Sequence, residues 1–236
     1  MDRPYRIVRF LLRPLLGTAW RWRIEGLEHI PADGPVLLAA NHISFLDPPV
    51  LAYGADRCGR VVRFLAMAEL FRIPVLGALL RSMGQIPVER STAAAAASLD
   101  AARTELEAGA CVGVFPEGGL SADLDPGPGR TGAVRLARST GVPIVPVGIW
   151  GTHRVHRKGR FPRWRPGVTV VVAAGRPLAI GPDEHARLAA DRLMSAICAQ
   201  VNRARSLSGD SASGMARMRT CRGPAVEARH RHRAGE

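Results

Sequence analysis

Short apolar runs alternate with segments of helical character along most of this chain. Several runs lack a polar residue at every second position, as expected for strands that are covered on both faces. Such runs predict strands over PVLLAA (35–40), RVVRFLAM (60–67), QIPVER (85–90), ACVGVFP (110–116), VPIVPVGIW (142–150) and GVTVVVAAG (167–175). Because helical segments separate most of them, we predict an α/β fold with a mixed, mostly parallel sheet flanked by helices.

The helical segments carry their own start and stop signals. Residues 91–109, STAAAAASLDAARTELEAG, begin with Ser or Thr as a possible cap, continue in alanine and end in glycine. Residues 182–204 begin with Pro-Asp-Glu, which suits the positive end of a helix. Shorter helices are predicted over 44–54, 69–84 (broken at Pro74) and 129–141.

The N-terminal segment, residues 1–23, mixes apolar residues with arginines. No apolar run in the chain reaches the ~18–20 residues needed to span a bilayer. We predict an amphipathic segment that lies in a membrane interface, with its arginines at lipid phosphates and Trp20 and Trp22 at headgroup level. An amphipathic helix packed on its own domain is the alternative.

Two further regions are predicted after this segment. Residues 24–205 hold the predicted strands and helices and form one globular domain. Residues 206–236 show little periodicity and end in a basic cluster, which predicts a disordered tail.

The charge of the chain predicts an anionic partner. The formal net charge is +13, and Lys158 is the only lysine, so arginine carries nearly all of the positive charge. An anionic membrane surface and a nucleic acid both fit this charge. No nucleic-acid-binding motif is recognisable, and aromatic residues, which stack on bases, make up only 5% of the chain. We therefore expect a membrane surface and no nucleic acid.

The cysteines give no sign of a metal site. The four residues are scattered, and no pair has the spacing of zinc ligands. No disulfide framework is expected from their positions, which are Cys58, Cys111, Cys198 and Cys221.

A candidate catalytic pair follows the first predicted strand. ANHISFLDP (40–48) places His42 five positions before Asp47, where a strand ends and a helix begins. In open α/β sheets, ligands bind at the carboxyl ends of the strands. A histidine there can take a proton from a substrate hydroxyl, and a carboxylate on its other ring nitrogen fixes the tautomer and stabilises the imidazolium. The alternative is a histidine without a catalytic role beside an aspartate that caps a helix.

Three further stretches follow this pair in a specific order. GQIPVER (84–90) begins at Gly84 and ends in Arg90, VFPEGGLS (114–121) follows a buried strand, and VPIVPVG (142–148) is an apolar strand with two prolines. Together with Asn-His-x4-Asp, these blocks resemble the four ordered motifs of the glycerolipid acyltransferases, typified by lysophosphatidic acid acyltransferase. The resemblance covers roughly residues 24–180 and implies a single acyltransferase domain.

The resemblance implies an enzyme of phospholipid biosynthesis, an O-acyltransferase that converts 1-acyl-glycerol-3-phosphate into phosphatidic acid. His42 would deprotonate the acceptor hydroxyl, Asp47 would orient His42, and the thioester of acyl-CoA or an acyl-carrier protein would be attacked. Arg90 would bind the acceptor's phosphate. The remaining substrate-binding residues would be Gly84, Phe115, Pro116, Glu117, Gly118 and Gly119.

The resemblance also implies where such an enzyme works and what it lacks. No metal or bound cofactor is expected, because the acyl donor is a substrate. The protein would be peripheral or monotopic at the cytoplasmic face of the cell membrane.

Two positions depart from the family's pattern. Leu120 stands where the third motif usually has arginine, and Met67 stands where a lysine is frequent. Each missing cation is a candidate phosphate contact, worth roughly 1.5–3 kcal/mol. Either the acceptor is another lysophospholipid or lipid-like hydroxyl, or other arginines compensate, the candidates being Arg63, Arg90 and Arg130. A further alternative is an inactive or repurposed member of the acyltransferase fold. The intact histidine–aspartate pair argues against it.

Overall fold

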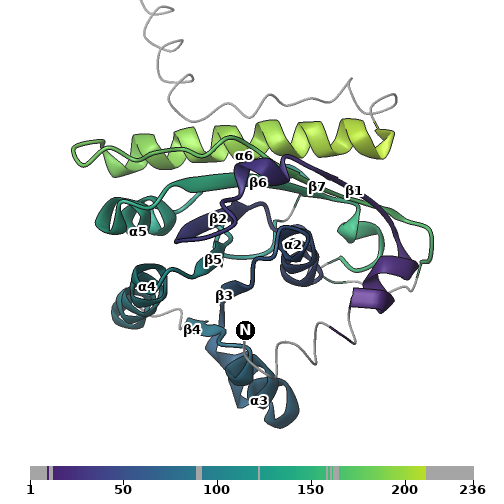
Figure 1. The fold of residues 1–236 in the computed structure, drawn as a ribbon, viewed down its shortest axis with the longest axis horizontal. Coiled ribbons are helices and arrows are strands. Elements are labelled where there is room, and N and C mark those ends of the chain that lie inside the picture. Colours follow the sequence, from purple (N-terminus) through teal and green to yellow (C-terminus); the bar gives the residue numbers. More distant parts are fainter. Residues whose placement is uncertain are drawn as a thin grey trace, which may run out of the picture.

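A seven-stranded sheet organises the part of the chain that the computed structural model describes, namely residues 10, 13–88, 92–121, 123–157, 159, 161 and 165–210 (Figure 1). Its strands are β1 (Arg21–Glu25), β2 (Val36–Ala40), β3 (Val62–Met67), β4 (Ile86–Val88), β5 (Cys111–Val114), β6 (Ile144–Trp150) and β7 (Thr169–Ala174). The α-helices are α2 (Asp47–Asp56), α3 (Pro74–Ser82), α4 (Thr92–Glu107), α5 (Gly132–Thr140) and α6 (Ala186–Ser208). Three 3₁₀ turns are η1 (Leu27–His29), η2 (Ala68–Arg72) and η3 (Thr152–Arg154).

The strand order is β1-β7-β6-β2-β5-β3-β4. The five strands from β6 to β4 are mutually parallel, whereas β7 runs antiparallel to β6 and pairs in parallel with β1. The predicted mixed, mostly parallel sheet flanked by helices is confirmed. The carboxyl ends of β2, β5, β3 and β6 therefore share one edge, and the connections that leave these strands start there.

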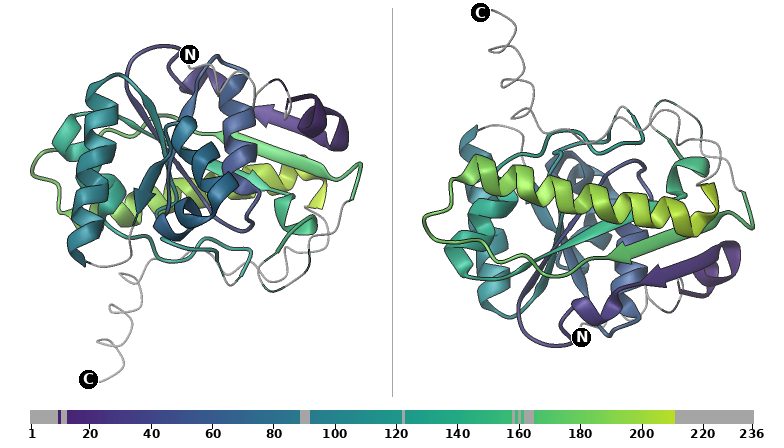
Figure 2. Two further views of the ribbon diagram at one scale, coloured as in Figure 1. Left: turned by 90° about the horizontal axis from the view of Figure 1, so that it is seen from below. Right: turned by 90° about the horizontal axis from the view of Figure 1, so that it is seen from above.

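Both faces of the sheet are buried, which explains the apolar runs without polar alternation. Leu37 and Ala39 of β2 face a core shared with α4, α5 and α6. Val36 and Leu38 face the opposite core, which α2 covers. Figure 2 shows α6 lying lengthwise across its face of the sheet. At the contact of α6 with β6, Gly148 has no room for a side chain, because a Cβ there would lie 2.2 Å from the Gln200 backbone.

The N-terminal segment contributes to the fold. Strand β1 begins at Arg21, so the boundary predicted at residue 23 falls inside a strand. Trp20 is only 6% exposed. Trp22 donates its indole N–H to the Leu16 carbonyl at 2.8 Å and stacks on Tyr53. The prediction that Trp20 lies at lipid headgroups is therefore wrong, because Trp20 is buried in its own domain. Trp22 is partly exposed, and its contact with a membrane stays a prediction. Residues 1–9, 11 and 12 lie outside the described part.

The last helix also differs from the prediction at both ends. It begins at Ala186 because Glu184 lies in the preceding turn, where its carboxylate accepts hydrogen bonds from Arg192 and from the Gly181 N–H. It ends at Ser208, past the boundary predicted at residue 205. Residues 211–236 of the predicted tail lie outside the described part of the chain. None of the helices described is both long and apolar enough to cross a membrane.

Two of the described cysteines, Cys58 and Cys111, are free thiols. Burial raises the pKa of the Cys111 thiol to about 12, which makes it an inert core residue.

Candidate active site

The site begins where β2 ends, at the carboxyl edge of the parallel strands. Asn41 is fully buried and bridges to β6: its side chain accepts the Ile149 N–H at 2.7 Å and donates to the Ile149 carbonyl at 3.1 Å. These two bonds continue the ladder between β2 and β6 by one residue. The backbone of His42 is therefore fixed just beyond the sheet.

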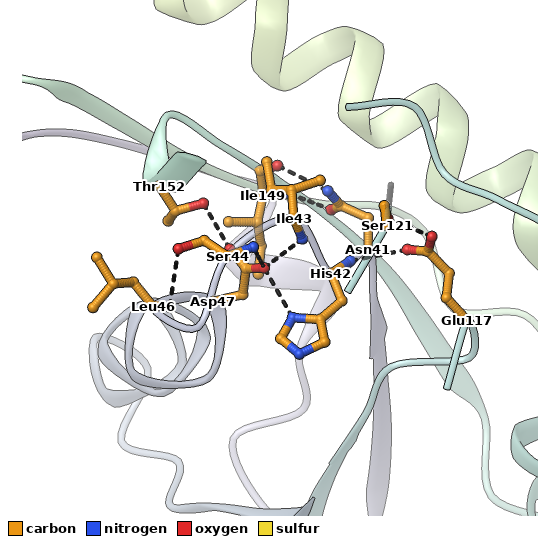
Figure 3. Close-up of polar contacts among 10 residues, drawn as sticks. All are labelled: Asn41, His42, Ile43, Ser44, Leu46, Asp47, Glu117, Ser121, Ile149 and Thr152. Atoms are coloured by element: carbon orange, nitrogen blue, oxygen red, sulfur yellow. Dashed lines mark hydrogen bonds and ion pairs between the residues drawn. The ribbon is translucent and has the colours of Figure 1, made fainter. Parts of the chain in front are cut away.

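His42 and Asp47 are in direct contact. The His42 Nδ1 lies 3.0 Å from Asp47 Oδ2 (Figure 3). Helix α2 starts at Asp47, with Pro48 and Pro49 in its first turn, and this start turns the carboxylate back toward the end of β2. The side chain of His42 is 16% exposed and that of Asp47 is fully buried.

The Asp47 carboxylate accepts four hydrogen bonds. Its Oδ2 also receives the backbone N–H groups of Ile43 at 2.6 Å and Ser44 at 2.7 Å. Its Oδ1 receives the Thr152 hydroxyl at 2.6 Å. Because Ile43, Ser44 and Thr152 all donate to it, the buried carboxylate acts as an acceptor, and it takes the Nδ1–H of His42 rather than supplying a proton. The lone pair of the imidazole is then on Nε2, which Figure 3 shows pointing away from Asp47.

Glu117 holds the other side of the His42 backbone. Its Oε1 accepts the His42 N–H at 2.9 Å, and its Oε2 accepts the Ser121 hydroxyl and the Gly127 N–H. The Ser121 N–H returns to the His42 carbonyl at 2.7 Å. The turn after β5 is thereby tied to the turn after β2, 75 residues earlier in the chain.

Aromatic rings line one side of the histidine. The Phe115 ring stacks on the His42 imidazole with centroids 4.2 Å apart, and Phe64 lies parallel behind Phe115 at 6.1 Å. Pro116 is buried, and its carbonyl accepts the Arg130 N–H at 2.8 Å.

An open cavity of about 320 Å³ lies beside this network. Its lining contains Gly118 in a left-handed conformation, with φ of 72°, which a glycine adopts without strain. A Cβ at Gly118 would lie 2.6 Å from Arg130 Nε, so the arginine side chain lies across this glycine. The lining residues are Glu117, Gly118, Gly119, Leu120, Ser121, Gly127, Pro128 and Arg130.

The other predicted site residues are placed differently. Arg90 lies outside the described residues. Gly84 forms the turn before β4, with φ of 66°, beside Arg63 and outside the lining of the cavity. Arg63 is ion-paired with Glu105 on α4, so its guanidinium already has a carboxylate partner.

Thr152 and Ser121 are site residues that the sequence did not single out. Thr152 follows a buried strand at its carboxyl end, which is the one signal that could have indicated it. Nothing in the sequence shows its contact with an aspartate 105 residues away. In the described part of the chain, no three His, Cys, Asp or Glu residues are grouped so that they could hold a metal ion.

Comparison with known proteins agrees with this geometry. The family model described as Acyltransferase matches residues 21–150, which include β1, the histidine–aspartate pair, the Glu117 turn and β6. The chain belongs to the acyltransferase family.

Similar members of the family are found in plants and bacteria. The chain is 36% identical over 138 residues to a chloroplastic 1-acyl-sn-glycerol-3-phosphate acyltransferase of Brassica napus, covering 58% of this chain and 39% of that protein. It is 35% identical over 132 residues to the 1-acyl-sn-glycerol-3-phosphate acyltransferase of Borreliella burgdorferi, covering 55% and 51%. The chain thus spans about two fifths to one half of these curated relatives.

A solved structure extends the similarity over most of the fold. The 1-acyl-sn-glycerophosphate acyltransferase PlsC of Thermotoga maritima superposes with a TM-score of 0.70 at 28% identity, covering 85% of this chain and 78% of that chain. The acyltransferase fold of this chain therefore extends beyond the residues that the family model matches.

Proposed function

We propose that this protein transfers a fatty acyl chain from a thioester donor to the hydroxyl of 1-acyl-glycerol-3-phosphate, giving phosphatidic acid. The observation that carries the proposal is the His42–Asp47 pair at 3.0 Å, with the carboxylate saturated by donors and Nε2 unpaired among the described residues. The relatives named as 1-acyl-sn-glycerol-3-phosphate acyltransferases support this acceptor.

In this reaction His42 acts as general base and then as general acid. Nε2 takes the proton of the acceptor hydroxyl while the oxygen attacks the thioester carbonyl carbon. The tetrahedral intermediate collapses by breaking the C–S bond, and the departing thiolate takes the proton back from Nε2. Asp47 stabilises the imidazolium between these steps and keeps its own charge throughout.

Arg130 is the cation that we assign to the acceptor's phosphate, in place of the arginine missing at Leu120. Both residues line the cavity beside the Glu117 turn. The Arg130 side chain is exposed and has no carboxylate partner in the described part of the chain, whereas Arg63 is already paired with Glu105. Glu117 in the same cavity repels a phosphate less than a free carboxylate does, because three donors hold its oxygens. Arg90 stays a second predicted contact.

A different lysophospholipid is the second candidate acceptor. Leu120 in the cavity lining favours it, because an apolar side chain stands where the family usually supplies a charge. The donor is acyl-CoA or an acyl-carrier protein, and the site of action that we propose is the cytoplasmic face of the cell membrane, with the protein peripheral or monotopic.

Release of free CoA from an acyl-CoA, measured in membranes that contain the protein, tests the function. Lysophosphatidic acid, lysophosphatidylcholine, monoacylglycerol and no acceptor are compared, and an acyl-carrier-protein donor is tried in parallel. We expect release that requires both lysophosphatidic acid and His42, so that His42→Ala abolishes it. Release only with another lysolipid would identify that lipid as the acceptor. Folded protein without His42-dependent transfer from either donor would overturn the proposal.

A further inference from the structure

Helix α3 exposes an apolar face. Val75 is 83% exposed, and the first charged residue of the helix is Arg81, in its last turn. A helix at a protein surface normally directs charged side chains to solvent, and a cluster of exposed apolar residues instead marks a contact. We name this cluster the α3 face; it consists of Ile73, Pro74, Val75, Ala78 and Leu79, all of which are exposed.

The α3 face cannot be buried by turning the helix. Gly77, on the opposite side, is buried against η2, and a Cβ there would lie 2.1 Å from the Phe71 carbonyl oxygen. The Arg81 guanidinium donates to the same carbonyl at 2.8 Å, which fixes the helix end. The inner side of α3 is therefore locked, and Val75 and Leu79, one turn apart, point outward together.

The α3 face lies at the edge of the sheet that carries the candidate active site. Strand β3 ends at Met67, at the same edge as the end of β2, and η2 and α3 follow directly. Strand β4 then starts opposite Leu65, only two residues before the end of β3. The connection that contains η2 and α3 therefore begins and ends near this edge. Phe45, three residues after His42, is a further apolar side chain exposed at this edge.

We propose that the α3 face is the surface by which this protein docks on an anionic lipid membrane. Val75 and Leu79 enter the acyl boundary, and the exposed Arg72 and Arg81, at either end of the face, meet lipid phosphates. A water-exposed protein partner would not require this edge, whereas a lipid acceptor reaches His42 from a membrane only if this edge faces it. The choice of lipid as the occupant rests in this respect on the proposed function.

Flotation of the full chain with vesicles tests the proposal without any acyl transfer. The vesicles contain phosphatidylglycerol and phosphatidylcholine, with phosphatidylcholine alone for comparison. The test variant is Val75→Asp with Leu79→Asp. The control is Leu188→Asp, at a position on α6 that is 62% exposed and lies on a helix covering one face of the sheet. We expect the α3 variant to bind anionic vesicles at least about tenfold more weakly, and the control to bind within about twofold of the unaltered chain.

Each outcome decides the question. Unchanged vesicle binding by a folded α3 variant overturns the proposal. If, in addition, the unaltered chain elutes as a dimer on size exclusion and the variant as a monomer, a second copy of the chain is the occupant. Thermal unfolding establishes that the variant is folded; if the double variant unfolds, Val75→Ser alone is measured against Leu188→Ser. The proposed function can fail separately: vesicle binding that depends on Val75 in a protein without acyl transfer would uphold this surface and overturn the reaction.

Discussion

The Thr152 hydroxyl donates to Asp47 Oδ1 at 2.6 Å, and both side chains are fully buried. Thr152 lies in η3, after β6, and it supplies the one hydrogen bond to Oδ1 among the described residues. It therefore holds the carboxylate in the rotamer in which Oδ2 faces His42. Thr152 thus positions the aspartate without touching a reacting atom.

Replacing Thr152 by valine keeps the shape of the side chain and removes the donor. The buried Oδ1 is then left without a partner, which costs about 1–3 kcal/mol of folding free energy. We expect kcat to fall by about tenfold with little change in KM, since one tenfold step corresponds to about 1.4 kcal/mol. Thr152→Ser should restore kcat, whereas a role in packing alone would leave serine as impaired as valine.

Replacing Asp47 by asparagine tests the charge on the carboxylate. The amide can no longer accept from all four donors, and it permits the wrong tautomer of His42, so kcat should fall by about 10³–10⁴-fold, as in other histidine–carboxylate pairs. Initial rates and thermal unfolding are measured together. Asp191→Asn, at a partly exposed ion pair on α6, is the control; comparable rates in the two variants would contradict the role of Asp47.

Replacing Arg130 by alanine tests the assignment of the phosphate contact. Loss of a charge-assisted hydrogen bond of about 1.5–3 kcal/mol should raise KM for lysophosphatidic acid by roughly 10–100-fold. The KM for monoacylglycerol, which has no phosphate, should stay the same. Arg135→Ala, exposed on the next helix, is the matched control; an equal change for both acceptors would show that Arg130 acts on the fold or on the donor.

Stability should depend on pH through His153. Burial, followed by the neighbouring cation of Arg154, lowers the pKa of His153 from 6.5 to about 4, and its ring packs on Trp150. Asp210 opposes the shift, whereas Arg157 and Arg205 add to it. Because the unfolded chain binds a proton below about pH 6.5 and the folded chain only near pH 4, the free energy of unfolding falls as the pH falls through this window.

The size of this effect is measurable by urea unfolding. Between pH 7 and pH 5, His153 should contribute a loss of about 2 kcal/mol, from about 1.4 kcal/mol per pH unit below its unfolded pKa. His153→Gln should remove this part of the pH dependence, and the comparison of the two chains cancels the other titrating groups. Equal slopes in the two chains would show that His153 is protonated in the folded state well above pH 4.

The sequence by itself determined the local parts of this protein. The order of strands and helices follows from apolar runs and from breaks such as Pro74, where α3 begins. The contact of His42 with Asp47 was also predictable, because a strand end followed by a helix start leaves residues five apart within reach of each other. Such features depend on backbone hydrogen bonds and sterics over a few residues.

Only the tertiary structure decided which distant residues complete the site. Strand β2 lies between β5 and β6, and this order brings Glu117 to the His42 backbone and Thr152 to Asp47. No local pattern encodes such neighbours, since they depend on the order in which the strands pair. The same holds for Trp20, which lies in a segment whose mixture of apolar residues and arginines predicted a membrane interface. Its burial depends on the domain that residues far along the chain build around it.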